Sequence, residues 1–72
     1  MTQAQAERHN PVLEEASREL EAAVHDAQVA YDCISLGYLD RAHTNAITAC
    51  AEAAAAETVL RAALAAKQSQ PA

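Results

Sequence analysis

The histidines and cysteines are the residues of this sequence best suited to metal or redox chemistry. The three histidines are His9, His25 and His43, and the two cysteines are Cys33 and Cys50. A structural zinc site needs four converging ligands, which commonly occur as Cys-x-x-Cys or His-x-x-x-His pairs, and neither pair is present in the sequence. We therefore predict no metal site and no cofactor.

The pattern of nucleophiles and carboxylates does not match a known catalytic arrangement. A Gly-rich phosphate loop and a Gly-x-Ser-x-Gly turn are both ruled out, because the chain has a single glycine. Glu14 and Glu15 are adjacent carboxylates, but neighbours on an exposed helix do not face one substrate as a glycosidase pair does. We expect that the protein is not an enzyme.

The aromatic and cationic residues near the middle of the chain are candidates for binding. Tyr31, Tyr38, Arg41 and His43 lie close together in the sequence. Tyr and Arg are enriched at binding hot spots, and a guanidinium group suits an anionic ligand. These four residues are our candidate ligand site. In the alternative interpretation, the tyrosines only cover a thin core.

The composition predicts that helices position these residues. Alanine occurs twenty times, whereas glycine occurs once and proline twice. Asn10 and Pro11 suit the cap and first position of a helix over 12–36. Gly37 suits a left-handed residue in a turn over 37–39, with Tyr38 folding back onto Cys33, and Asp40 could cap a second helix over 40–67. We expect residues 1–10 to form a flexible or short helical arm and residues 68–72 a disordered tail.

Apolar residues recur at intervals of three and four in both predicted helices, which indicates one buried stripe on each. The short connection between the helices requires them to be antiparallel. We therefore predict an all-α fold, an antiparallel helical hairpin. The predicted stripe of the first helix is Leu13, Ala16, Leu20, Ala23/Val24, Ala27, Ala30/Tyr31 and Ile34, and that of the second is Leu39, Ala42, Ala46, Ala49/Cys50, Ala53, Ala56, Leu60 and Ala63/Leu64.

The core of a single hairpin would be thin. Only twelve residues are Val, Ile or Leu, and Phe and Trp are absent from the sequence. Residues 49–56 are small except for Glu52, so this helix could pack closely on two sides. We expect a homodimeric four-helix bundle or a higher ring, although helix propensity alone could also explain the alanines. The predicted oligomer interface is Leu20, Val24, Ile47, Cys50, Ala53, Ala54 and Leu60.

The hairpin register separates the two cysteines. Cys33 should lie opposite residue 43 and Cys50 opposite residue 27, which places their sulfur atoms on the order of 10 Å apart along the axis. A disulfide needs Cα atoms within about 7 Å, so we predict no intrachain bridge. Both cysteines are interpreted as small buried hydrophobic residues, with an intermolecular bridge as the alternative.

The net charge of −5 comes from the first half of the chain. This charge disfavours nucleic acid and anionic membranes as partners. The acidic side chains either keep the protein soluble or form a docking surface for a basic protein partner. The candidate partner-binding residues are Glu14, Glu15, Glu19, Asp26, Tyr38 and Arg41. The polar N-terminus and the lack of an apolar run near ~20 residues lead us to expect a cytoplasmic protein.

The layout also resembles known small proteins. Leu13-x-x-Ala16-Ser17-x-x-Leu20 opens the first helix, Arg41 follows Gly37, and Ala46-Ile47 begins the inner stripe of the second helix. This layout is similar, over residues 13–64, to a group of small bacterial two-helix proteins of uncharacterised function, and the resemblance implies a hairpin. The chain more loosely resembles phage-encoded inhibitors of host proteins. It also resembles phage anti-immunity hairpins that form rings and sequester cyclic nucleotides, although it has fewer basic residues than they do.

These observations lead to three hypotheses about function. In the first, the chain is a non-catalytic, self-associating module that binds and inhibits or modulates a protein partner. In the second, it is an oligomer that binds or sequesters a small ligand, such as a cyclic nucleotide, near the hinge. In the third, it is a purely structural assembly protein.

Overall fold

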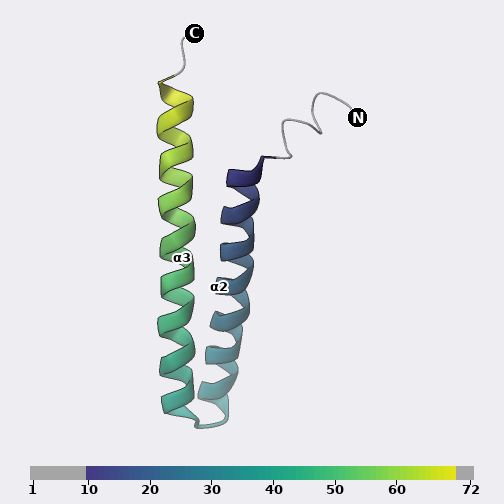
Figure 1. Cartoon of the computed structure of the whole chain (residues 1–72). Coiled ribbons are helices and arrows are strands. Elements are labelled where there is room, and N and C mark those ends of the chain that lie inside the picture. The colour runs from purple at the N-terminus through teal and green to yellow at the C-terminus, as the bar shows by residue number, and fades with distance from the viewer. Residues whose placement is uncertain (1–9, 70–72) are drawn as a thin grey trace, which may run out of the picture.

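The protein is an antiparallel pair of helices. The computed structural model describes residues 10–69, in which α2 runs over Pro11–Ser35 and α3 over Leu39–Gln68, with no strand in that range. Figure 1 shows the two helices side by side, joined at one end by a short hinge. The predicted all-α hairpin is confirmed. The predicted N-terminal arm and most of the predicted tail lie outside the described residues.

Helix α2 begins at the predicted residues. The Asn10 side chain accepts a hydrogen bond from the Val12 backbone N–H at 2.9 Å, and Pro11 occupies the first helical turn. An Asn cap satisfies one of the four backbone donors that a helix start leaves free, and Pro has no such donor. The start of the hairpin is therefore determined by local chemistry.

The hinge at residues 36–38 is a glycine-dependent helix end. Gly37 has a φ of 80°, in the left-handed region. The Tyr38 N–H donates to the Cys33 carbonyl at 2.8 Å, and the Gly37 N–H donates to the Ile34 carbonyl at 3.0 Å. These two bonds form a Schellman motif, which satisfies carbonyls that the end of α2 would otherwise leave free. The predicted role of Gly37 is confirmed.

Helix α3 begins one residue earlier than predicted, at Leu39. Its cap residue is Tyr38, which makes no side-chain capping hydrogen bond, and Asp40 lies inside the first turn. The prediction that Asp40 caps this helix is therefore wrong. A carboxylate in the first turn still interacts favourably with the positive end of the helix dipole.

Alanines fill the contact between the helices, which we call the seam. Ala16, Ala23 and Ala30 of α2 are buried and recur every seven residues. On α3, Ala42 and Ala56 are buried and Ala49 and Ala63 are half-buried, again at seven-residue intervals. A seven-residue repeat keeps one stripe facing the partner along a pair of slightly supercoiled helices, and alanine lets the helix axes approach closely.

The predicted buried stripes are correct for these alanines and wrong for the large apolar residues. Leu20 is 43% exposed, Val24 is 70% exposed and Tyr31 is 68% exposed. A leucine or tyrosine at the seam would push the helix axes apart, so these side chains lie beside the seam rather than in it. The helices meet through their smallest side chains and leave their largest ones outside.

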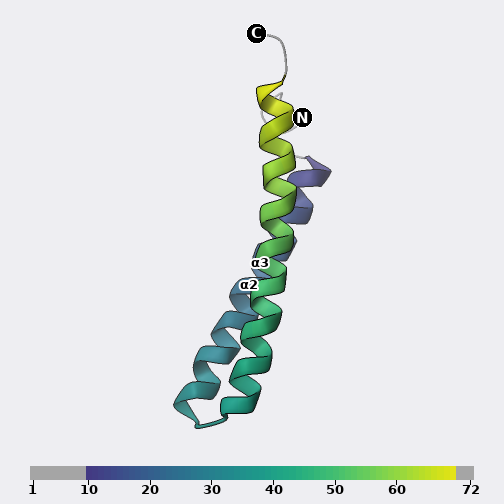
Figure 2. The same cartoon turned by 90° about the vertical axis from the view of Figure 1, so that its left-hand side faces the viewer.

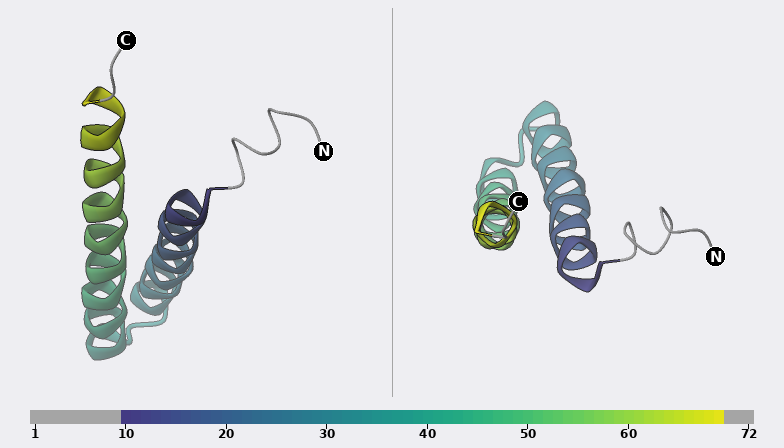
Figure 3. Two further views of the ribbon diagram at one scale, coloured as in Figure 1. Left: turned by 45° about the horizontal axis from the view of Figure 1, so that its top comes forward. Right: turned by 90° about the horizontal axis from the view of Figure 1, so that it is seen from above.

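The hairpin is one helix layer thick. Two helices packed side by side form a single layer about as thick as one helix, roughly 10–12 Å. Figures 2 and 3 show the two helices crossing at a shallow angle without a further element on either side. Domains generally bury their apolar surfaces between at least two layers, so both broad faces of this layer are open.

Candidate functional site

The large apolar side chains gather on one side of the hairpin. On each helix they lie about a quarter-turn around the axis from the seam alanines. The direction of this rotation is the same on α2 and α3 when each helix is viewed from its own N-terminus. Because the helices are antiparallel, both stripes then face the same side. We call this surface the apolar face, and it consists of Leu13, Leu20, Val24, Tyr31 and Ile34 of α2 with Leu39, Cys50, Leu60 and Leu64 of α3.

The open end of the hairpin supports this arrangement. Leu13 of α2 lines a surface depression together with Leu60 and Leu64 of α3, so the two stripes are adjacent there. All nine residues of the apolar face are exposed. The sequence did not reveal that Leu13, Ile34, Leu39 and Leu64 lie on this face, because their spacing predicted stripes between the helices.

Two residues of the predicted oligomer interface lie elsewhere. Leu20, Val24, Cys50 and Leu60 belong to the apolar face, and Ala53 falls on the same side of α3 by its spacing from Cys50. Ile47 and Ala54 instead lie on the side of α3 that points away from α2, since each is about half a turn from the seam alanines. The structure therefore divides the predicted interface into one coherent face and two outlying residues.

Three carboxylates lie along the seam. Glu19, Asp26 and Glu52 are half-buried at the positions between the seam alanines. The Oε1 atom of Glu52 is buried and receives no hydrogen bond within residues 10–69. A hydrogen bond between the Asp26 and Glu52 carboxyl groups requires a proton and raises the pKa of Glu52, and burial and the negative charges of Asp26 and Glu19 raise it further. Nearby His25, whose Nδ1 lies 3.8 Å from Asp26 Oδ1, lowers this pKa.

The predicted acidic docking surface is therefore divided. Glu19 and Asp26 lie at the seam, where half of their surface is covered, whereas Glu15 is exposed. Glu14 is half-buried near the start of α2. Of the four predicted acidic contact residues, only Glu15 is fully on the surface.

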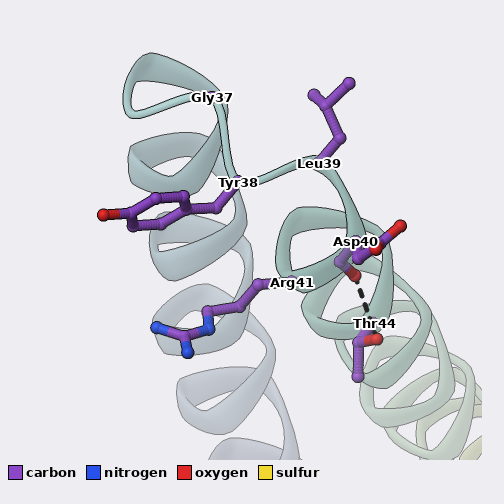
Figure 4. A pocket seen from close by; sticks show the side chains of 6 residues that line it. All are labelled: Gly37, Tyr38, Leu39, Asp40, Arg41 and Thr44. Carbon is purple, nitrogen blue, oxygen red and sulfur yellow. Dashed lines mark hydrogen bonds between the residues drawn. The ribbon is translucent and has the colours of Figure 1, made fainter.

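The hinge brings Tyr38 and Arg41 together. The Arg41 guanidinium carbon lies 5.8 Å from the centre of the Tyr38 ring, within the range of a cation–π contact. Figure 4 shows both side chains projecting to the same side of the hinge, while Leu39 and Asp40 point elsewhere. Both residues are exposed, and in the described part of the chain no carboxylate pairs with Arg41.

The other two candidate ligand residues do not join this pair. The shallow depression at the hinge is lined by Gly37, Tyr38, Leu39, Asp40, Arg41 and Thr44, without Tyr31 or His43. Tyr31 lies on the apolar face, and His43 is exposed on α3. Within one chain, the structure therefore brings together Tyr38 and Arg41 of the four predicted ligand residues.

The two cysteines have different environments. Cys33 is buried and Cys50 is exposed, and both are free thiols. The prediction that both are buried is wrong for Cys50, because its position on α3 belongs to the apolar face rather than the seam. Within residues 10–69, no three His, Cys, Asp or Glu side chains are grouped so that they could hold a metal ion.

Comparisons with protein-family models, curated proteins and solved structures found no match to this chain. Neither α2 nor α3 contains a stretch apolar enough to cross a membrane.

Proposed function

We propose that the chain is a non-catalytic, self-associating helical module that binds and inhibits or modulates a protein partner in the cytoplasm. The observation that carries this proposal is the apolar face. The helices meet mainly through alanines, and most of the large apolar side chains of the described residues are exposed, with Val29 and Val59 half-buried. Contiguous exposed apolar surface of this kind is typical of protein–protein contacts.

The hinge is a second candidate contact region, which we assign to the protein partner. Tyr38 and Arg41 belong to the residue types enriched at binding hot spots, and their contact with each other limits their conformational freedom before binding. The net charge of −5 favours a partner with a basic surface. Exposed Asp32 and Asp40 near the hinge would act at the rim of such a contact, where charges mainly affect the rate of association, whereas Glu15 lies at the far end of α2.

Photo-crosslinking in the native cell tests this proposal. A photoreactive amino acid at Tyr38 should crosslink to a protein other than the chain itself, and the same residue placed at Ala65 on α3 should not. The crosslinked protein should also be recovered by the purified chain, and the Tyr38→Ala/Arg41→Ala variant should recover at least about tenfold less of it. If recovery is the same for this variant, the hinge does not bind the partner.

The alternative is a ligand-binding oligomer, and a specific feature of the hinge favours it. Arg41 has no acidic partner within residues 10–69, and it lies beside the uncapped start of α3. Both features would attract an anion such as a cyclic nucleotide. Thermal-shift measurements with nucleotides distinguish the two functions. A stabilisation that Arg41→Ala abolishes would support the ligand function, and no shift with any nucleotide would exclude it.

A further inference from the structure

We infer that the apolar face is covered by a second copy of this chain, which docks face to face to form a two-fold symmetric four-helix bundle. The inference rests on the proposed function, because it names the surface and the occupant through which the module self-associates. It is argued from exposed area, from charge and from the shape of the face.

The exposed apolar surface is large for so small a chain. All nine residues of the apolar face are exposed, and Val24, Tyr31 and Leu39 are 70%, 68% and 68% exposed. Monomeric proteins rarely leave a contiguous apolar patch of more than a few hundred Å² uncovered, and larger patches mark contacts with other molecules. A second copy of the chain presents an apolar surface of the same size and shape.

The charge on the apolar face is compatible with an identical chain as the occupant. The chain carries a net charge of −5, so two copies repel each other unless they meet through a neutral surface. Glu57 lies on the apolar face by its spacing, seven residues from Cys50 and from Leu64, and it forms a 2.7 Å ion pair with Arg61 that is neutral as a unit. On α2, His25 and Asp32 lie away from this face by their spacing, and Glu21 lies at its edge. The apolar face is thus a surface on which two acidic copies can meet with little repulsion.

The shape of the face gives the bundle its form. The face extends over both helices, from Leu13 and Leu64 at the open end to Leu39 at the hinge. Two such faces in contact place two helices on two, which is the arrangement of a four-helix bundle. Because a two-fold axis relates the two copies, the same residues of each copy form both sides of the contact. The contact is then complete with two chains, and no third chain can add to it. The second layer also covers the large apolar side chains that a single layer of two helices leaves open.

Sedimentation of the purified chain, with a matched pair of variants, tests this inference. Val24→Glu places a charge on the apolar face, at a residue that is 70% exposed in the single hairpin. Thr48→Glu is the control, since Thr48 is also exposed but lies on the other broad side of α3 by its spacing from Ala49 and Cys50. Both substitutions replace a β-branched residue with a better helix former, so each variant should keep its helical circular dichroism. The wild type and Thr48→Glu should sediment at twice the chain mass at about 50 µM.

Val24→Glu should weaken the dimer at least about a hundredfold, because the two-fold axis buries the new charge twice. A helical wild-type chain that remains at 7.6 kDa would overturn the inference, as would equal dissociation constants for the two variants. A dimer that loses partner crosslinking at the hinge would instead contradict only the partner-binding function. A monomer that still captures its partner through Tyr38 would contradict the inference and the self-association in the proposed function, and would leave the partner binding standing.

Discussion

Glu52 shows how a single carboxyl group can make the stability of the hairpin depend on pH. Its pKa lies above the ordinary value of 4.5, mainly because it shares a hydrogen bond with Asp26. A group whose folded pKa is raised stabilises the fold when protonated. This contribution is fully present below the unfolded pKa and is lost as the pH rises through the folded pKa.

We therefore predict that Glu52→Gln raises the melting temperature at pH 7, because glutamine keeps a donor for Asp26 without adding a second negative charge. The difference from the wild type should shrink as the pH falls toward 4.5. Thermal melts followed by circular dichroism between pH 4 and pH 8 measure this change. If Glu52→Gln melts below the wild type at pH 7, the two carboxyl groups do not share a proton.

Glu57 provides a control, because its pKa is shifted in the opposite direction from the pKa of Glu52. The hydrogen bond from Arg61 lowers the pKa of Glu57, so its contribution is present above the ordinary pKa of 4.5 and is lost as the pH falls through the lower folded value. Glu57→Gln should therefore lower the melting temperature at pH 7, and by a small amount because the pair is exposed. The same melts compare the two variants, and equal shifts in the same direction would contradict both assignments.

Gly37 is a residue at which the effect of backbone conformation on stability can be measured separately from side-chain contacts. A Cβ at this position would meet nothing within 4 Å, so Gly37→Ala should lose stability only through its φ of 80°. We predict a loss of about 1 kcal/mol for alanine and a smaller loss for asparagine, which tolerates the left-handed region. Chemical denaturation measures both losses. An unchanged free energy of unfolding for Gly37→Ala would show that the hinge does not need a left-handed residue.

For the two helices, the sequence predicted the first and last residues well. It predicted less well which side chains of each helix are buried against the other helix. Helix ends depend on local chemistry, so Asn10, Pro11 and Gly37 could be interpreted from neighbouring residues alone. The buried side depends on what faces each helix across the seam, and alanines lie on almost every side of α3. Hydrophobicity therefore favoured Leu20 and Leu60 as seam residues, whereas close approach of the helices selected alanines. The pairing of Asp26 with Glu52 also depends on the register between helices, which no local pattern reveals.

Substitution in the seam tests this role of residue size. Ala56 is fully buried, and Ala56→Leu should destabilise the hairpin by about 1–3 kcal/mol through overpacking. Ala51 is exposed on the same helix, and Ala51→Leu should change stability by less than about 0.5 kcal/mol. Urea denaturation of both variants measures the difference. A stable Ala56→Leu protein would mean that the helices do not meet closely through alanines.

In the whole molecule, small side chains are buried while most of the large apolar side chains are exposed. The hairpin buries mainly alanine methyl groups and leaves most of its large apolar side chains exposed, nine residues counting Cys50 lying on one open face. Two helices that bury so little should gain much of their stability from whatever covers that face. Folding and association should then be one linked equilibrium, in which the dimer is favoured by mass action.

The most direct test of this central claim is the concentration dependence of the melting temperature of the purified wild-type chain. The account predicts that the melting temperature rises steadily as the concentration increases from about 1 µM to about 1 mM, since dissociation accompanies unfolding. Val24→Glu should melt at a lower temperature that depends less on concentration. A wild-type melting temperature that is constant over this range would show that the hairpin is stable alone, and would contradict the claim that its apolar face must be covered.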